Sequence, residues 1–355
     1  MANVHSLPAD DMGDFVARLF AAAGLSTGAA RRVSAALIEA DLSGRGSHGV
    51  LQAEGYLARL MAGAMSTGEK PEVISEAGGA VVLDAARIEG HLAAEEGMAI
   101  AIAKAREQGV AAIAVRHGFH IGVAGRYARM AAEAGCAALV MCNTKPVMAA
   151  PGGAERLLGT NPLAIGIPAS GGPMVLDMAT SAGTFGRIRH ARATGQAIPE
   201  GWALDAEGRP TTDPRAAMEG LLLPMSGFKG FGLALAIDLL SGLFASGGWG
   251  GTLGELDDDL SKPQNASYLF ITLDVAHFRG LDDFADGAEA ALERIRNSRL
   301  ADGTTRLFTP GERSAEALAS NDGTIRVAAS VVEALMARAD ALGVAVPAFL
   351  RAASP

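Results

Sequence analysis

Residues 44–49, with the sequence GRGSHG, combine two kinds of chemistry in six positions. The three glycines match the G-x-G-x-x-G spacing of dinucleotide-binding turns, in which the backbone approaches a pyrophosphate. Between them, Ser47 and His48 place a hydroxyl beside an imidazole, and such a pair can move a proton. The stretch therefore predicts either a phosphate-binding turn or a proton-transfer site.

The segment before GRGSHG decides against the dinucleotide turn. A Rossmann turn follows a β-strand, but residues 31–42, RRVSAALIEADL, have the apolar period of a helix. No acidic residue closes a second strand about twenty positions later. The proton-transfer interpretation is better, because glycines on both sides leave the imidazole uncrowded. A lone histidine at a helix end is more often a cap, so this interpretation needs support from elsewhere.

A second glycine-flanked imidazole gives that support. RHGFHIGVAG places His117 and His120 directly after the apolar stretch VAAIAVRH, and ligands bind where the strands of α/β sheets end. Hydrolase and metal chemistry are disfavoured. The sequence has no G-x-S-x-G elbow and no H-E-x-x-H, and ELDDDL lacks the Gly and Glu positions of a calcium loop. We expect no metal site.

Periodic patterns predict the elements that position these residues. Apolar residues at helical spacing predict helices across 9–42, broken at GLST, and at 53–65. β-Branched residues around a Gly-Gly turn predict two strands within 72–86. Helices and strands then alternate, which predicts a sheet with helices packed on it. The later expected elements are helices at 91–109, 124–135, 229–247, 278–297 and 327–342, and strands at 110–117, 136–144, 159–168, 172–181 and 266–275.

Composition limits the partners. The 355 residues carry a net charge of -9, which disfavours nucleic acid and anionic membranes because both need clustered Lys and Arg. The N-terminus lacks the apolar stretch of a signal peptide, and we expect no run near the roughly 18 apolar residues of a membrane span. Cys136 and Cys142 are interpreted as buried free thiols. The expected location is the cytoplasm.

Eight short motifs occur in an order that resembles one known family. They are SHGV, HIGVAGRYA, GTNPLAIGIP, VLDMATS, IPEGWALD, PTTDP, FKGFGLALAIDLLSG and TPGER. The chain resembles the non-Rossmann malate/L-lactate dehydrogenase family, which includes L-sulfolactate, ureidoglycolate and 2,3-diketogulonate dehydrogenases and piperideine-2-carboxylate reductases. The resemblance implies NAD or NADP bound without a Rossmann turn, a small-molecule substrate and a homodimer.

The resemblance also implies a non-Rossmann NAD(P)-binding α/β fold, with a helical domain and a separate mixed sheet domain. On this basis we expect a helical N-terminal part at 1–74 and a cofactor-binding sheet domain at 75–185. Residues 186–262 are expected to return to the helical domain with a mobile loop. Residues 263–309 are expected to complete the sheet domain, and residues 310–355 to form C-terminal helices.

Site residues follow from the resemblance, position by position. His48 resembles the proton donor and Ser47 its relay partner, while Thr160 resembles a substrate-binding hydroxyl. His120 opens a loop expected to meet both cofactor and substrate. The positions matching cofactor-binding segments are His120, Ile121, Gly122, Val123, Ala124, Met178, Ala179, Thr180, Lys229, Gly230, Arg306, Pro310, Gly311 and Glu312.

Four positions depart from the family pattern, mostly at the substrate end. Gln52 stands where many members have an Arg for the substrate carboxylate. Arg187 stands where imine reductases have an acidic residue. Gly46 replaces an acidic residue, and Tyr268 replaces a His. We expect Arg187 either to bind the substrate anion in place of residue 52, or to face solvent or the cofactor 2′-phosphate.

The predicted function is hydride transfer between NAD(P) and a small 2-oxo or 2-hydroxy acid of the malate, lactate or sulfolactate type. A first alternative is a cyclic imine reductase acting on piperideine-2-carboxylate or pyrroline-2-carboxylate. A second is a nucleotide-binding protein that has lost turnover. Retention of Ser47, His48, Thr160 and Lys229 disfavours this last alternative.

Overall fold

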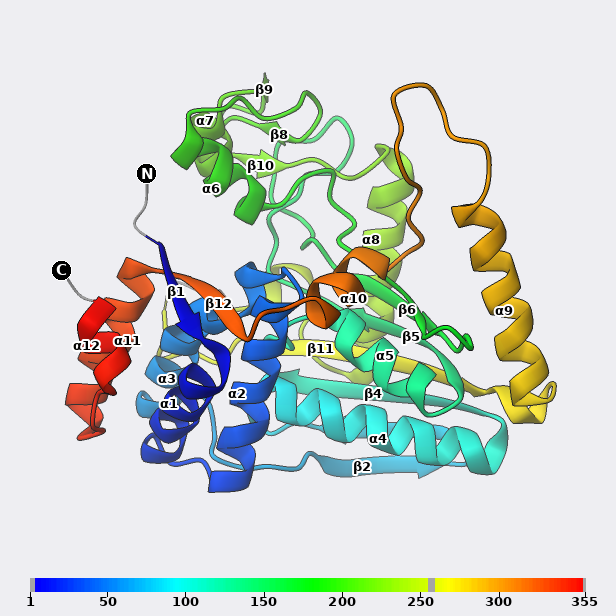
Figure 1. The fold of residues 1–355 in the computed structure, drawn as a ribbon, viewed down its shortest axis with the longest axis horizontal. Helices are drawn as coiled ribbons and strands as arrows, with labels where there is room; N and C mark the ends of the chain where they lie inside the picture. Colours follow the sequence, from blue (N-terminus) through cyan, green and yellow to red (C-terminus); the bar gives the residue numbers. More distant parts are fainter. Residues whose placement is uncertain (1–3, 255–258, 354–355) are drawn as a thin grey trace.

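The computed structural model describes residues 4–254 and 259–353, with side chains described as far as Arg351. One layer is mainly helical and contains both ends of the described chain (Figure 1). Its helices bury a common apolar core that includes Phe15, Val33 and Leu335. The elements of this layer are β1 (Val4–Pro8), α1 (Ala9–Ala22), α2 (Thr27–Leu42), α3 (Ala53–Met61), β12 (Thr324–Ala328), α11 (Ala329–Leu342) and α12 (Ala348–Ala353).

The second layer is a seven-stranded mixed sheet in the order β2-β3-β4-β11-β5-β6-β7. Only β3 and β4 pair in parallel; the other neighbours are antiparallel. β11 comes late in the chain but lies in the middle of the sheet. The strands are β2 (Glu72–Ala77), β3 (Ala80–Asp84), β4 (Val110–Gly118), β5 (Cys136–Cys142), β6 (Leu163–Ile167), β7 (Met174–Met178) and β11 (Ala266–Asp274).

Helices cover both faces of this sheet. α4 (Gly90–Gln108) and α5 (Ala124–Glu133) pack on one face, where Ile113, Val115 and Phe270 are buried. α8 (Phe228–Ser241) packs on the other face, against Ala114 and Leu269. Successive strand residues point to opposite faces, which explains why neighbouring residues of β4 contribute to different cores.

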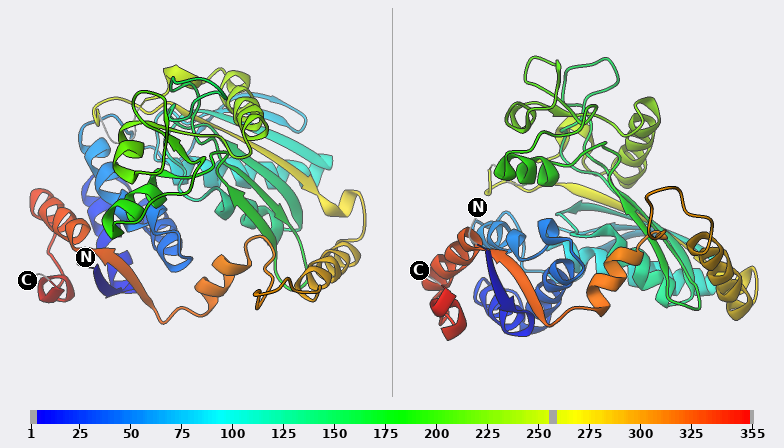
Figure 2. Two further views of the ribbon diagram at one scale, coloured as in Figure 1. Left: turned by 90° about the horizontal axis from the view of Figure 1, so that it is seen from above. Right: turned by 45° about the horizontal axis from the view of Figure 1, so that its top comes forward.

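Residues 185–222 form a part with its own small core, which also includes Val147, whereas α8, later in the same expected segment 186–262, covers the seven-stranded sheet. A short sheet in the order β10-β8-β9 packs with α6 and α7, and the right view of Figure 2 shows this group, in green, at the top of the molecule near α8. Residues 255–258, in the acidic loop expected to be mobile, lie outside the described residues. The elements are α6 (Phe185–Thr194), β8 (Ala203–Leu204), β9 (Pro210–Thr211), α7 (Pro214–Glu219) and β10 (Leu221–Leu222).

Two helices join the layers near the C-terminal end. α9 (Leu281–Arg296) follows the central strand, and α10 (Glu312–Ala319) leads into β12. The predicted α/β class with a helical part and a mixed sheet is confirmed. The helix expected at 327–342 begins at Ala329, because residues 324–328 pair as a strand with β1. Cys136 and Cys142 are buried free thiols, as predicted.

One expectation about membranes needs correction. Residues Phe228–Ala245, which include α8, have a mean hydropathy of 1.5 over 18 residues, so by length and composition they could cross a membrane. Core helices of globular proteins pass the same test. Here Ile237 packs against the sheet, and the buried Asp238 accepts hydrogen bonds from Gly250 N at 2.9 Å and from the Asn161 side chain at 3.4 Å. We interpret α8 as a sheet-covering helix.

Candidate active site

The GRGSHG stretch connects two helices, as expected for a site that is not a Rossmann turn. After α2 it forms a 3-10 turn, Gly46–His48, and a second such turn leads into α3. Asp41, near the end of α2, accepts a hydrogen bond from Val50 N at 2.8 Å. A Cβ at Gly49 would lie 2.2 Å from this carboxyl group, so only glycine fits there. Asp41 therefore fixes the loop that carries His48.

Ser47 and His48 meet a second imidazole. Ser47 Oγ lies 2.9 Å from His48 Nδ1, and the His48 ring stacks on His120 with 5.4 Å between ring centroids. On its other side, His120 Nδ1 lies 2.5 Å from the hydroxyl of the buried Tyr56. The structure thus brings together the two glycine-flanked imidazoles singled out in the sequence. His117, by contrast, pairs with Asp84 at 2.9 Å and lies outside this cluster.

Burial and nearby positive charge keep both stacked imidazoles neutral. Desolvation, followed by the charges of Arg45 and His91, lowers the pKa of His48 to about 4. The pKa of His120 falls well below its usual value for the same reasons, with His48 and His91 contributing after burial. A neutral His48 can accept a proton at physiological pH. Its donation of a proton then depends on a prior protonation.

Of the expected substrate-binding residues, two are already engaged within the protein. Gln52 Nε2 donates to the carbonyl oxygen of Ser47 at 2.9 Å, so its amide orients the catalytic loop. The Thr160 carbonyl accepts hydrogen bonds from both the backbone N and the hydroxyl of Thr180, each at 2.9 Å. The Thr160 hydroxyl lies 3.5 Å from that of Thr144 and remains within reach of a ligand.

Arg187 lies on α6, whose first turn approaches the catalytic loop. A Cβ at the preceding residue, Gly186, would lie 3.6 Å from Ser47 Cβ. The exposed guanidinium of Arg187 stacks over the Trp202 ring at 4.9 Å. A cation held over an indole ring keeps its N–H groups available for an anion. The first turn of α6, which carries Arg187, therefore lies close to Ser47.

The segments expected to bind cofactor form two neighbouring groups. Ala124 begins α5, and β7 ends at Met178. Met225 N donates to the Thr180 carbonyl at 2.9 Å, which brings the start of α8, with Lys229 and Gly230, beside residues 178–180. Lys229 is exposed. Residues 178–180 and the start of α8 thus come from distant parts of the sequence but lie side by side.

A cavity of about 390 Å³ lies between α5, β7 and the turn before α10. Among the residues lining it are Val123, Asp177, Pro310, Gly311 and Glu312. Cavities of this size are typical of ligand sites. Burial raises the pKa of Asp177, which accepts a hydrogen bond from Gly125 at the start of α5. Asp177 therefore has a structural role at the helix N-terminus.

Within the TPGE turn, the charged side chains bind one another. Arg306 pairs with Glu312 and Glu316 and stacks on Phe308 at 4.6 Å. Glu312 also accepts from Thr309 N at 2.8 Å, and this hydrogen bond is the leading cause that lowers the pKa of Glu312 to about 2. The two side chains thus hold the shape of the turn that lines the cavity.

The residues present fit a dinucleotide. Gly122 has a φ of +66°, and a Cβ there would lie 2.3 Å from His91 Nε2, so this loop packs closely against the first turn of α4 and requires glycine at this position. The cavity beside Val123 and Gly125 supplies space, and the exposed Lys229 lies in the first turn of α8. The positions predicted to hold NAD or NADP stay 120–124, 178–180, 229–230 and 306–312, as the family resemblance implies.

Sequence inspection missed several residues that support the site. Tyr56 and Asp41 bind the two catalytic loops, and Trp202 lies under Arg187. A weak signal existed for Asp41, an acidic residue in the last turn of a helix just before GRGSHG. Tyr268, noted as a departure from the family pattern, is fully buried and donates to the Phe119 carbonyl, next to His120. Its role is to support the strand that leads into the site.

Comparison with known proteins decides the family. The family model described as malate/L-lactate dehydrogenase matches residues 7–336. The chain belongs to this family. It is 35% identical over 319 residues to a malate dehydrogenase of Pyrococcus abyssi, covering 88% of this chain and 87% of the relative. It is 33% identical to a (2R)-3-sulfolactate dehydrogenase (NADP(+)) of Chromohalobacter salexigens, covering 90% and 93%.

The fold agrees with the family. The solved sulfolactate dehydrogenase from Methanocaldococcus jannaschii superimposes with a TM-score of 0.91 at 30% identity, over 96% of this chain and 98% of that one. The protein is therefore an oxidoreductase of the malate/L-lactate dehydrogenase family that depends on NAD or NADP. The predicted family, enzyme class and cofactor class are confirmed.

Proposed function

We propose that this family member interconverts a small 2-hydroxy acid and the corresponding 2-oxo acid, with His48 as the group that carries the proton. The observation that supports this most directly is the arrangement of Ser47, His48 and His120, in which a neutral imidazole is hydrogen-bonded on one side and stacked on the other. The malate and sulfolactate relatives act, by their names, on 2-hydroxy acids.

In the oxidative direction, neutral His48 accepts the proton of the substrate hydroxyl through Nε2. Its Nδ1–H donates to Ser47 Oγ at 2.9 Å, which holds the ring in that tautomer and stabilises the imidazolium that forms. Gln52 holds the Ser47 backbone, and His120 limits rotation of the His48 ring. The nicotinamide of the cofactor, when bound, accepts hydride in this direction and supplies it in the reverse one.

Arg187 is our candidate for the substrate carboxylate. Gln52 carries no charge and is bound to Ser47 O, whereas Arg187 is exposed, stacks over Trp202 and directly follows Gly186, which lies against Ser47. A charge-assisted hydrogen bond is worth roughly 1.5–3 kcal/mol. The Thr160 hydroxyl is the second candidate contact for the substrate.

A panel assay tests the proposal. Binding of NADH and NADPH is followed by fluorescence, and turnover by absorbance at the nicotinamide band with a set of 2-oxo acids and cyclic imines. We expect turnover of at least one 2-oxo acid. We expect His48→Ala to lose at least about a hundredfold in kcat, the usual size of an acid–base contribution, with cofactor affinity retained. Cofactor binding without turnover on any compound would instead indicate a nucleotide-binding protein.

We also propose that the enzyme is a cytoplasmic homodimer. Support comes from the outer face of α8 and the turn after it, where Leu239, Leu243 and Phe244 are 41%, 49% and 65% exposed. Monomeric proteins rarely expose contiguous apolar patches of this kind, and a second copy of the chain would cover it. Light scattering of the purified enzyme should give twice the chain mass. Phe244→Asp should shift that mass toward the monomer.

A further inference from the structure

A buried ion pair lies directly beneath the loop that carries His120. Glu89 is the N-cap of α4, and one of its carboxylate oxygens accepts from the backbone N of His91 at 2.8 Å and of Leu92 at 3.2 Å. The other oxygen contacts His91 Nδ1 at 2.8 Å. Both side chains are buried, Glu89 completely and His91 to within 1%. An Asp or Ser would cap the helix equally well, so capping does not account for the imidazole.

The first turn of α4, which carries the pair, supports the backbone of residues 119–122 by direct contact. A Cβ at Gly90, between the two paired residues, would lie 2.1 Å from the His120 carbonyl oxygen. His91 Nε2 occupies the space beside Gly122 in the same way. The backbone around His120 therefore rests on the first turn of α4, and a change in His91 moves the surface against which this loop packs.

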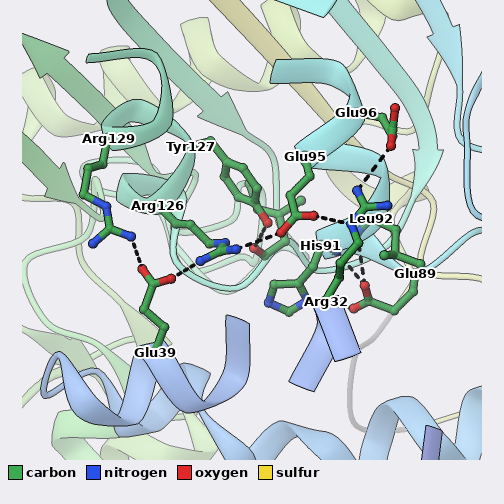
Figure 3. Close-up of polar contacts among 11 residues, drawn as sticks. Arg32, Glu39, Glu89, His91, Leu92, Glu95, Glu96, Arg126, Tyr127 and Arg129 are labelled. Atoms are coloured by element: carbon green, nitrogen blue, oxygen red, sulfur yellow. Dashed lines mark hydrogen bonds and ion pairs between the residues drawn. The ribbon is translucent and has the colours of Figure 1, made fainter. Parts of the chain in front are cut away.

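Ion pairs connect α2, α4 and α5 around this contact (Figure 3). Arg126 of α5 binds Glu39 of α2 and, at 2.8 Å, Glu95 of α4. Arg32 of α2 binds Glu95 at 2.7 Å. Tyr127 donates to the Ile121 carbonyl at 2.7 Å, which ties the loop to α5. Three helices are thus connected through charged side chains, and Tyr127 connects the loop to one of them.

From His91 the contacts continue to the reacting groups. The Tyr56 ring meets His91 edge-on with 6.0 Å between centroids. The Tyr56 hydroxyl binds His120 Nδ1, and His120 stacks on His48. Because neutral His120 can accept only at an unprotonated nitrogen, we assign the phenol as the donor and place the His120 proton on Nε2. The orientation of His120 is therefore set by Tyr56.

The positive charge of His91 also affects the proton-transfer site. The groups that face it are Glu89 and Glu95 from α4, Tyr56 from α3 and His120 from the loop. Burial lowers the pKa of His91, but the two carboxylates together outweigh burial and raise it. His91 therefore favours the imidazolium, and its charge is among the causes that lower the pKa of His48 and of His120.

We propose that the buried Glu89–His91 pair is a positioning element for the proton-transfer site. The pair supports the His120 backbone and, through Tyr56, holds the His120 ring against His48. This rests on the proposed function of His48. Neither Glu89 nor His91 touches the reacting groups. Both act through the loop, through Tyr56 and through the positive charge of His91.

Two substitutions that remove the charge in different ways test the proposal. His91→Gln keeps a hydrogen-bond donor near Glu89, and Glu89→Gln keeps the cap acceptor while removing the carboxylate that does most to raise the pKa of His91. The matched control is His277→Gln, because His277 forms a similar pair with Asp274 at 2.6 Å at the far end of β11. The histidine titrations are measured by NMR in the free protein, and kcat is measured with the best substrate of the panel.

In both test variants we expect the pKa of His48 to rise and kcat to fall by about tenfold or more, since small displacements of catalytic groups can cost a hundredfold. The control should leave both unchanged. A folded Glu89→Gln or His91→Gln protein with a wild-type His48 titration refutes the proposal, as does loss of the folded state in both variants. The NMR titration needs neither cofactor nor substrate, so its outcome stands even if the panel shows no turnover.

Discussion

The low pKa of His48 predicts opposite pH dependences for the two directions of the reaction. At pH 7, a group with a pKa of about 4 carries a proton in about one molecule in a thousand. Oxidation of a hydroxy acid needs the neutral imidazole, so its kcat/KM should be flat from pH 5 to pH 8. Reduction needs the imidazolium, so its kcat/KM should fall about tenfold for each pH unit, about a thousandfold over the same range.

The assay measures both directions in buffers of constant ionic strength, with saturating cofactor and with His48→Ala as the control. Arg45→Gln sharpens the test, because Arg45 is the charge that contributes most to lowering the pKa of His48 after burial. In this variant, the pH at which kcat/KM for reduction begins to fall should be higher. The reasoning is refuted if oxidation shows a half-maximum between pH 6 and pH 7.5 that disappears in His48→Ala, since His48 would then titrate as an ordinary histidine.

Three further predictions concern residues around this centre. Lys229→Ala should raise the KM for the cofactor and make it less sensitive to salt, because an exposed ammonium acts by Coulomb attraction; a change confined to the substrate KM would contradict this. Arg187→Ala should raise the substrate KM about tenfold or more without altering NADH affinity, whereas a change in NADPH affinity alone would place Arg187 at the 2′-phosphate. Burial raises the pKa of Asp41 to about 6, above its unfolded value of 3.8, so ionising it in the folded state costs stability that grows as pH rises from about 4 to 6. Asp41→Asn should therefore increase the melting temperature more at pH 7.5 than at pH 4, and an equal increase at both would show that the charge is not the cause.

Local features of the site could be predicted from the sequence. Ser47 and His48 are adjacent in the sequence, and the helices on either side have clear apolar periods. The sequence therefore predicts both the proton-transfer pair and that this stretch is not a Rossmann turn. The contact between His120 and His48 was suggested only by their shared glycine-rich context. Tyr56 gave no signal, because its partner His120 lies 64 residues away and the hydrogen bond depends on how α3 packs beside the loop that follows β4.

The elements that escaped prediction lack a local pattern. α6 has only Ile188 and Ala191 buried, so its sequence shows no apolar stripe, and the sequence predicts only that residues 186–262 return to the helical domain with a mobile loop. β1 and β12 are each five residues long and pair across almost the whole chain. Glu89 and His91 look like ordinary residues at the start of a helix. Their importance comes from the backbone of residues 119–122, which only the tertiary structure brings against them.

The central place of β11 has a consequence for synthesis. β4 and β5 leave the ribosome long before Ala266–Asp274, and at 5–20 residues per second the interval is on the order of ten seconds. During that time the two strands each have an open edge in the middle of the future sheet, and open edges invite pairing with other chains. A nascent chain that stops before residue 266 has no strand to insert. The enzyme thus depends on its last third to protect its own interior from aggregation while it is being made.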